Sequence, residues 1–349
     1  MLEQASFVWT LMNTETKPVS PSIESNDESI HNLTRADSSR QSGLTDLPEE
    51  KINLMAESLL FELRKAMGVS QTGSLSAITE YLFGRSVRRF SALALGLDRV
   101  IEQHGTAAGA RWLLPNFVVD HGAQGLENIP ADGPLLIAAN HPASYDGMVI
   151  SAYIYRPDYK IIIGQDPPYE HLPALSEHAI FSPPPKETQG RMLTVRKSIQ
   201  HLREGGSLLI FPRGTIEPDP AFMPGSDAEF NCWSRSLELF LRNVPHLRVL
   251  VTMVSGVIAQ ACMRHPITWF RKERRDRQRL AFMYQMLRQA ISGKELFGLK
   301  PQVTFGEVLS GMNPQSILNE VERAARQTLA LHMAQPGLQA RGSSFQGAG

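Results

Sequence analysis

Residues 135–147 read Leu-Leu-Ile-Ala-Ala-Asn-His-Pro-Ala-Ser-Tyr-Asp-Gly, and this stretch sets the architecture of the chain. Its first five residues are apolar and uncharged, which predicts a buried strand, and the polar residues after them mark a point where a sheet opens onto a ligand crevice. Pro142 disfavours helical geometry at His141, and its fixed φ suits the first turn of a new helix. We therefore expect a strand, a polar turn and a helix, with the His141 imidazole at the strand end.

His141 and Asp146 are the candidate catalytic pair of this turn. A histidine with a pKa near neutrality can take a proton from a hydroxyl, and a carboxylate on its other ring nitrogen would fix the tautomer and stabilise the imidazolium. The structural alternative is a capped turn with a solvated histidine. The His-x4-Asp spacing alone does not decide between the two, because such spacings of common residues arise by chance.

Further residues before this stretch, and a second block after it, bear on that choice. The preceding residues include Val118-Val119, Gly122, Glu127-Asn128-Ile129-Pro130 and Gly133-Pro134, and residues 205–215 read Gly-Gly-Ser-Leu-Leu-Ile-Phe-Pro-Arg-Gly-Thr. The first block resembles that of the glycerolipid acyltransferases, the 1-acylglycerol-3-phosphate acyltransferase family with its His-x4-Asp motif. The second resembles that family's Phe-Pro-Glu-Gly-Thr block. Two blocks in the right order are more specific than one, and the resemblance extends over residues 118–260.

The resemblance implies a fold and a reaction. The fold would be α/β and glycerol-3-phosphate acyltransferase-like, and the protein would be an O-acyltransferase of phospholipid biosynthesis. It would move a fatty acyl group from a thioester, acyl-CoA or acyl carrier protein, to a hydroxyl of a glycerol-phosphate or lysophospholipid-like acceptor. His141 would be the general base and Asp146 its support, with the thioester as co-substrate and no cofactor or metal. Two alternatives stay open: a non-catalytic lipid-binding or scaffold protein on the same fold, and an esterase that uses the same pair with water.

The second block offers candidate substrate-binding residues in Arg213, Gly214 and Thr215. Gly214 permits close backbone approach at the turn, the guanidinium can bind a phosphate with two donors, and the Thr215 hydroxyl adds a further donor. The resembled family has a glutamate where this chain has Arg213, which leaves the acceptor's identity open. The alternative for Arg213 is an ion pair with Glu217 or Asp219 that shapes the loop.

Arg191 and Arg196 are further candidates for binding the acceptor headgroup. The resembled family places an arginine shortly after an Ile-Phe pair, whereas Ile180-Phe181 is followed here by a serine and three prolines. Arg191 and Arg196 are the nearest arginines that follow. The alternative is that both are exposed helix residues that interact with neighbouring glutamates.

The chain divides into four segments by composition and periodicity. Residues 1–47 carry eight serines and few large apolar residues, which predicts a disordered tail. Residues 48–117 have apolar residues at helical spacing, and this helical segment would pack on the core or lie on a membrane surface. Residues 118–335 alternate strands and helices, which predicts an α/β acyltransferase domain with a central, largely parallel sheet flanked by helices. Residues 336–349 should form a flexible tail.

Composition narrows the class of protein and its partners. The 349 residues include 35 basic and 35 acidic side chains, so the zero formal net charge gives no general reason to expect nucleic-acid binding. Cys232 and Cys262 are too few for a disulfide framework, which favours a reducing compartment. The N-terminus lacks the basic region of a signal peptide, and the longest uncharged apolar stretch, residues 249–263, is shorter than the roughly 20 residues of a transmembrane helix. We expect a cytoplasmic protein without a transmembrane span, whose membrane contact is peripheral.

A basic run over residues 264–279 is the strongest local charge in the chain. It holds seven arginine and lysine residues against Glu273 and Asp276, with Trp269 and Phe270 within it. The run could contact anionic lipid, an acidic acyl carrier protein or the phosphates of coenzyme A. The alternative is a solvated helix face.

Overall fold

The computed structural model describes residues 47–67, 70–184, 187–233, 236–311 and 316–335, together with residues 313 and 338. The tails predicted over residues 1–47 and 336–349 lie outside the described residues, apart from Leu47 and Leu338. Within the described helices, none is both long enough and apolar enough to cross a bilayer.

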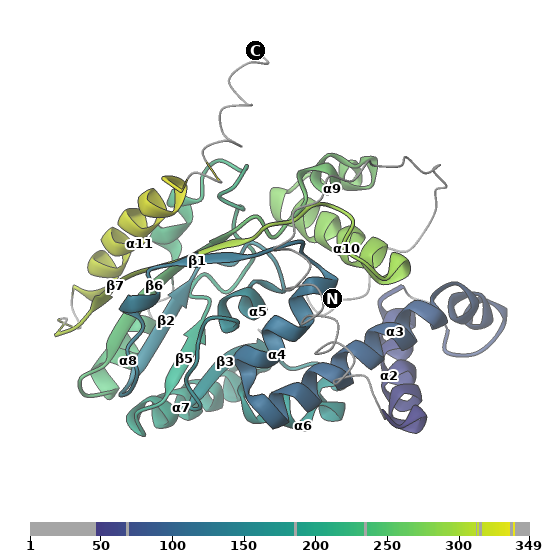
Figure 1. The fold of residues 1–349 in the computed structure, drawn as a ribbon, viewed down its shortest axis with the longest axis horizontal. Helices are drawn as coiled ribbons and strands as arrows, with labels where there is room; N and C mark the ends of the chain where they lie inside the picture. The colour runs from purple at the N-terminus through teal and green to yellow at the C-terminus, as the bar shows by residue number, and fades with distance from the viewer. Residues whose placement is uncertain are drawn as a thin grey trace, which may run out of the picture.

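A mixed, mostly parallel sheet forms the centre of the described chain (Figure 1). Its seven strands lie in the order β1 (Gly122–Gln124), β7 (Gln302–Leu309), β6 (Arg248–Ser255), β2 (Leu135–Ala139), β5 (Ser207–Ile210), β3 (Tyr159–Gly164) and β4 (Ala179–Ser182). All neighbouring strands are parallel except β6 and β7, which are antiparallel. The prediction of an α/β fold with a central, largely parallel sheet is confirmed, and β1 and β4 add short edge strands that the sequence pattern did not predict.

Strand β2 is uniformly apolar because it lies in the middle of this sheet with both faces covered. Its five residues are fully buried, and Ile137 lies opposite Leu209 of β5 and Leu250 of β6. A strand covered on both faces reads as a continuous apolar run rather than an alternating one. Because β2, β5 and β6 are parallel, their carboxyl ends share one edge of the sheet, and His141 leaves β2 at that edge.

Two layers of helices cover the two faces of the sheet. The helices beyond the N-terminal segment are α5 (Asp146–Ser151), α6 (Pro173–Glu177), α7 (Thr188–Arg203), α8 (Ser236–Asn243), α9 (Gln260–Arg264), α10 (Arg274–Ser292) and α11 (Ile317–Met333). Side chains alternate between the faces of a strand. Accordingly, Ile137 packs in one core cluster with α5, α9 and α10, whereas Leu136 packs in another with α7, α8 and α11. The same separation of α10 from α11 is visible in Figure 1.

The N-terminal helical segment consists of α2 (Glu49–Met67), α3 (Ser74–His104) and α4 (Thr106–Leu113). Its apolar stripes pack against the core: Met55, Leu97 and Ile101 are buried in one cluster. The same cluster contains Leu172, which precedes α6, and Leu175 in the middle of α6. Figure 1 shows α2 and α3 beside α4 and α6, at the side of the sheet. Burial of these stripes favours the core-packing interpretation of the helices over a membrane-facing one.

Candidate active site

The side chains of His141 and Asp146 meet in the turn after β2. The Nδ1 atom of His141 lies 3.1 Å from each carboxylate oxygen of Asp146. Asp146 is fully buried, and its carboxylate also accepts the backbone N–H groups of Ala143 and Gly147, both at 2.9 Å. These two bonds hold the carboxylate toward the ring. The His141 side chain keeps 23% of its surface exposed, so the ring is accessible from solvent while Nδ1 is engaged with Asp146.

The imidazole of His141 is also fixed by packing. Its ring stacks on Phe211, the first residue after β5, with the ring centroids 4.2 Å apart and the planes at 22°. Gly147 gives this layer its space, because a Cβ atom built at that position would lie 2.7 Å from Ile161 Cδ1 and 3.7 Å from the Phe211 ring. A larger residue at the start of α5 would therefore displace the end of the Ile161 side chain beside Phe211.

Glu217, in the loop after β5, holds the main chain of His141. The His141 N–H donates to Glu217 Oε2 and the Glu217 N–H donates to the His141 carbonyl, both at 2.8 Å. The second carboxylate oxygen accepts Trp233 Nε1–H at 2.8 Å. Burial raises the pKa of Glu217 to about 7, although its hydrogen bonds and the nearby His141 act in the opposite direction. A buried acid that titrates near neutrality thus lies directly behind the catalytic candidate.

Helix α10 and strand β6 are tied to the same turn by amide side chains. Gln278 Nε2 donates to the carbonyl groups of Pro142 at 2.8 Å and Glu217 at 2.6 Å. Asn140 binds both backbone groups of Val254, donating at 2.9 Å and accepting at 2.8 Å. The turn that carries His141 is therefore fixed from α10, β6 and the loop after β5 together.

The electrostatic surroundings raise the pKa of His141 above its ordinary value of 6.5. Burial alone disfavours the imidazolium and would lower this pKa. The charge of Asp146, its hydrogen bond and the charge of Glu217 outweigh burial, while Arg279 on α10 opposes them. The pair is thus arranged to stabilise a proton received by His141, which is what a general base requires.

Arg213 is ion-paired with Glu229, and not with Glu217 or Asp219, the two partners named in the loop-shaping alternative. Its Nε atom donates to Glu229 at 2.7 Å, whereas Glu217 is hydrogen-bonded to His141 and Trp233. Asp219 is also engaged elsewhere, because it accepts the backbone N–H groups of the residues that follow β6. The partner of Arg213 therefore lies in the 3₁₀ turn Asp227–Cys232.

The rest of the second block forms an open turn. Gly214 has a φ of +66°, and its N–H donates to the Phe211 carbonyl at 3.0 Å. No atom lies within 4 Å of a Cβ built at Gly214, so the space beside the turn is free on that side. Thr215 is half-buried next to it. The turn leaves room for a ligand group beside Arg213, which keeps the substrate-binding interpretation of this block open.

Arg191 and Arg196 lie apart from the pair. Both are exposed on α7, and no contact joins either side chain to His141, Asp146 or Arg213 in the part of the chain that the structure describes. Arg196 lines a shallow surface cleft with Arg203 of the same helix. The geometry therefore gives Arg191 and Arg196 no support as headgroup ligands.

The structure adds residues to the site that the sequence pattern did not identify. Glu229 accepts hydrogen bonds from Arg274 at 2.9 Å and Arg275 at 3.4 Å as well as from Arg213. The basic run was a sequence signal for the two α10 arginines. Glu217 was considered only as an ion-pair partner of Arg213, and nothing in the local sequence indicated Gln278 or Glu229.

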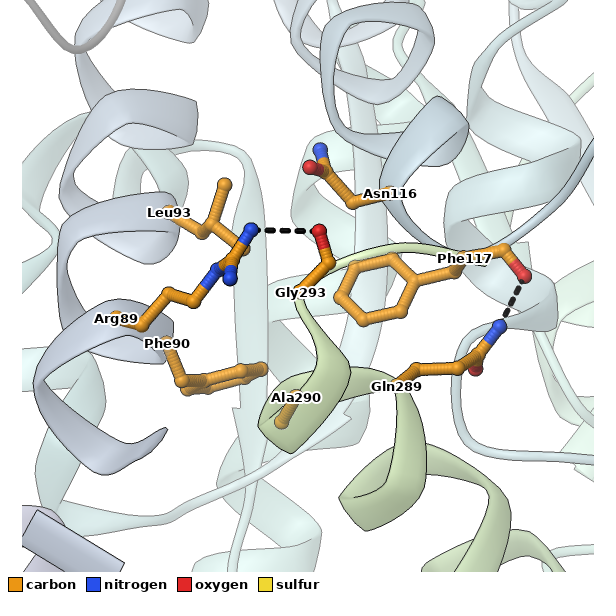
Figure 2. Close-up of a pocket in the computed structure, with 8 residues that line it drawn as sticks. All are labelled: Arg89, Phe90, Leu93, Asn116, Phe117, Gln289, Ala290 and Gly293. Carbon is orange, nitrogen blue, oxygen red and sulfur yellow. Dashed lines mark hydrogen bonds between the residues drawn. The ribbon is translucent and has the colours of Figure 1, made fainter. Parts of the chain in front are cut away.

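A second concave feature lies away from the pair (Figure 2). Its lining residues are Arg89, Phe90, Leu93, Asn116, Phe117, Gln289, Ala290 and Gly293. Figure 2 shows Arg89 directed at the Gly293 carbonyl and Gln289 at that of Phe117, where the two hydrogen bonds measure 2.5 and 2.7 Å. None of the predicted site residues lines this pocket, which is a narrow packing gap between α3 and the end of α10.

Comparisons with known proteins place both sequence blocks in one family. The sequence model of the family described as Acyltransferase matches residues 122–235, which include His141, Asp146 and Arg213. Curated protein sequences give no match. Among solved structures, the chain is similar to the crystal structure of the 1-acyl-sn-glycerophosphate (LPA) acyltransferase PlsC from Thermotoga maritima, with 16% identity, a TM-score of 0.38, and coverage of 82% of this chain and 99% of that one. Residues 122–235 of the chain therefore match the acyltransferase family.

Proposed function

We propose that the protein transfers a fatty acyl group from a thioester, acyl-CoA or acyl carrier protein, to a hydroxyl of a glycerol-phosphate or lysophospholipid-like acceptor. The observation that carries this proposal is the His141–Asp146 pair, with Nδ1 on the carboxylate at 3.1 Å and the His141 side chain 23% exposed. The pair lies inside the segment that matches the acyltransferase family.

The mechanism follows from the engagement of the His141 Nδ1 atom by Asp146. Asp146 holds the proton on Nδ1, so the lone pair of Nε2 is free to take the proton of the acceptor hydroxyl. The oxygen attacks the thioester carbonyl and forms a tetrahedral intermediate. Collapse of that intermediate breaks the carbon–sulfur bond, and the imidazolium returns its proton to the leaving thiolate. Asp146 remains ionised throughout and stabilises the imidazolium.

One product assay separates this reaction from its two alternatives. The pure protein is incubated with an acyl thioester labelled in the acyl chain, together with glycerol 3-phosphate, lysophosphatidic acid, lysophosphatidylcholine or a simple alcohol. Label in an acylated acceptor supports transfer. Label recovered only as free fatty acid indicates an esterase, and an unchanged thioester with retained lipid binding indicates a scaffold; either result overturns the proposal.

We further propose that the protein is cytoplasmic and contacts the membrane peripherally through Trp269 and Phe270. These side chains are 70% and 85% exposed in the 3₁₀ turn between α9 and α10, and exposed Lys272 follows them. Aromatic residues beside basic ones suit the interface of an anionic bilayer. This surface adjoins the catalytic candidate, because α10 begins at Arg274 and reaches the Pro142 carbonyl through Gln278.

A further inference from the structure

We propose that Arg213, Arg274 and Arg275 form a phosphate-binding site in which Glu229 is the resident counter-ion that a substrate phosphate joins or displaces. The inference deepens the proposed function and rests on it for the identity of the substrate. It extends the expected role of Arg213 to two arginines of α10, and it assigns Glu229 the role of an internal competitor.

Three guanidinium groups from two distant segments converge on one carboxylate. Glu229 accepts from Arg213 Nε at 2.7 Å, from Arg274 at 2.9 Å and from Arg275 at 3.4 Å. The arginine side chains are 21%, 33% and 38% exposed, whereas Glu229 is 15% exposed. The cations therefore surround the carboxylate and still face solvent, where an incoming anion can reach them.

The charges in this cluster do not balance. Three positive charges meet one negative charge, which leaves a surplus of two positive charges. Burial acts to raise the pKa of Glu229, but the three arginines lower it overall, so the carboxylate is ionised at neutral pH. A phosphate monoester carries about −1.5 to −2 charges near pH 7, which matches the surplus. A carboxylate ligand would neutralise half of it and a neutral acceptor none.

The donor geometry also fits phosphate. A guanidinium presents a planar fork of N–H donors that matches phosphate oxygens, and three of them can bind separate oxygens of one group. Further donor capacity lies on the same helix, because the Nε atoms of Arg277 and Arg279 are buried without a hydrogen-bond partner among the described residues. The start of α10 thus supplies more donors than its protein partners use.

The cluster is connected to the reacting centre through two sets of non-covalent contacts. Arg213 follows Phe211 by two positions, and Phe211 stacks on the His141 ring. Arg274 bonds to Gln278 at 2.6 Å, and Gln278 bonds to the carbonyl of Pro142, the residue after His141. A phosphate held by the cluster would therefore belong to a molecule whose reacting atom lies near Nε2. Glycerol 3-phosphate, lysophosphatidic acid and coenzyme A each carry a phosphate monoester.

The test measures binding without turnover, by isothermal titration calorimetry on the full chain. The ligands are glycerol 3-phosphate, coenzyme A and dephospho-coenzyme A, and the variants are Arg275→Ala, Arg275→Lys and Glu229→Gln. The matched control is Asp227→Asn, since Asp227 lies on the same 3₁₀ turn but pairs with Arg326 of α11 at 3.4 Å. Thermal melts confirm that each variant is folded.

Arg275→Ala should weaken phosphate binding about ten- to a hundredfold, the worth of one charge-assisted hydrogen bond. Arg275→Lys should fall between wild type and alanine, Glu229→Gln should bind more tightly than wild type, and Asp227→Asn should not change. A loss confined to glycerol 3-phosphate assigns the site to the acceptor. A loss for coenzyme A that dephospho-coenzyme A does not share assigns it to the donor.

Unchanged affinity for both phosphate ligands in folded Arg275→Ala would overturn the proposal, as would weaker binding in folded Glu229→Gln. These outcomes are independent of catalysis. A protein that binds phosphate through the cluster but transfers no acyl group refutes the proposed function and leaves the anion site standing. A protein that transfers acyl groups but binds no phosphate through the cluster supports the proposed function and refutes the anion site.

Discussion

The partly exposed His141 and the fully buried His332 make opposite use of similar hydrogen bonding. His141 has Nδ1 on the Asp146 carboxylate at 3.1 Å, and its side chain is 23% exposed. His332, on α11, has Nε2 at 2.7 Å from Ser255 Oγ and Nδ1 at 2.8 Å from Thr304 Oγ1, with no exposed surface. The pKa of His141 is raised, whereas burial lowers that of His332 to about 4.

The difference shows that hydrogen bonds alone do not make a histidine a base. Both imidazole rings are hydrogen-bonded at a ring nitrogen, but of the two only His141 has an anion as its partner. An ionised carboxylate stabilises the imidazolium and offsets burial, whereas two hydroxyls do not. His332 is therefore neutral, and both of its ring nitrogens are hydrogen-bonded. These bonds join α11 to β6 and β7 and leave no ring nitrogen for a substrate.

Replacing each histidine by alanine should separate these roles most strongly. His141→Ala should lower kcat/KM for acyl transfer by about 10²–10⁴, the usual contribution of a general base, with little loss of stability. His332→Ala should leave kcat within a few-fold and lower the free energy of unfolding by about 1–3 kcal/mol for each hydroxyl left without a partner. Steady-state kinetics and urea unfolding check both. A His141→Ala enzyme with turnover near wild type would contradict the role of His141 as the general base.

Replacing the carboxylate that partners His141 should lower kcat almost as much as replacing His141 itself. Asp146→Asn lets the amide hold the wrong tautomer and removes the charge that stabilises the imidazolium, so we expect a loss of kcat of at least about 10². The matched change on the other histidine, Thr304→Val, should leave kcat unchanged. Equal effects of the two substitutions on kcat would show that Asp146 acts only by holding the fold.

Stability should depend on pH in opposite directions through the two buried networks. The pKa of Glu217 is raised from 4.5 to about 7, so its folded state binds the proton more tightly and stability falls as pH rises across that interval. The pKa of His332 is lowered from 6.5 to about 4, so stability rises as pH rises across that interval. Each contribution is about 3 kcal/mol.

Urea unfolding of Glu217→Gln and His332→Gln at pH 4 to 8 measures the two contributions. Relative to wild type, Glu217→Gln should gain stability as pH rises from 4.5 to 7, and His332→Gln should lose it as pH rises from 4 to 6.5. Parallel curves for wild type and Glu217→Gln would mean that this carboxyl does not titrate in the folded protein near neutrality.

The smallest expected effect concerns the exposed aromatic residues beside the start of α10, on the His141 side of the molecule. Replacing Trp269 and Phe270 by serine should reduce binding to anionic vesicles about tenfold, because their apolar surface would no longer enter the bilayer. Tyr81→Ser on α3 is the control, since Tyr81 is 88% exposed. Cosedimentation at rising salt should also show weakening, as exposed charges are screened over about 10 Å at 0.1 M. Equal binding to neutral and anionic vesicles would contradict a basic docking surface.

The sequence predicted the parts of the site that are local. The strand, the turn and the start of α5 lie within residues 135–147, so their apolar run, proline and polar residues were sufficient to place His141 and Asp146 together. The direction of β7 was not predictable in the same way, because a short apolar run shows that a strand exists but not how it pairs. Its antiparallel pairing with β6 is a property of the whole sheet.

The supporting residues were missed because their contacts join distant parts of the chain. Glu217 lies 76 positions from His141 and Gln278 lies 136 positions from Pro142, so their approach depends on strand order and helix placement. Conversely, Arg191 and Arg196 were chosen by spacing along the chain. Helix α7 buries Thr194 and Ser198 instead, which leaves both arginines on its outer side.

The pH dependence of kcat/KM in wild type and in Glu217→Gln tests most directly whether neutral His141 is the base for acyl transfer. This quantity reports the ionisation of the free enzyme. We expect a loss of activity through one protonation as pH falls, with a midpoint above 6.5 in wild type, and persistence of that loss in Glu217→Gln. A flat profile, or a pH dependence that disappears in Glu217→Gln, would contradict the assignment of His141 as the base.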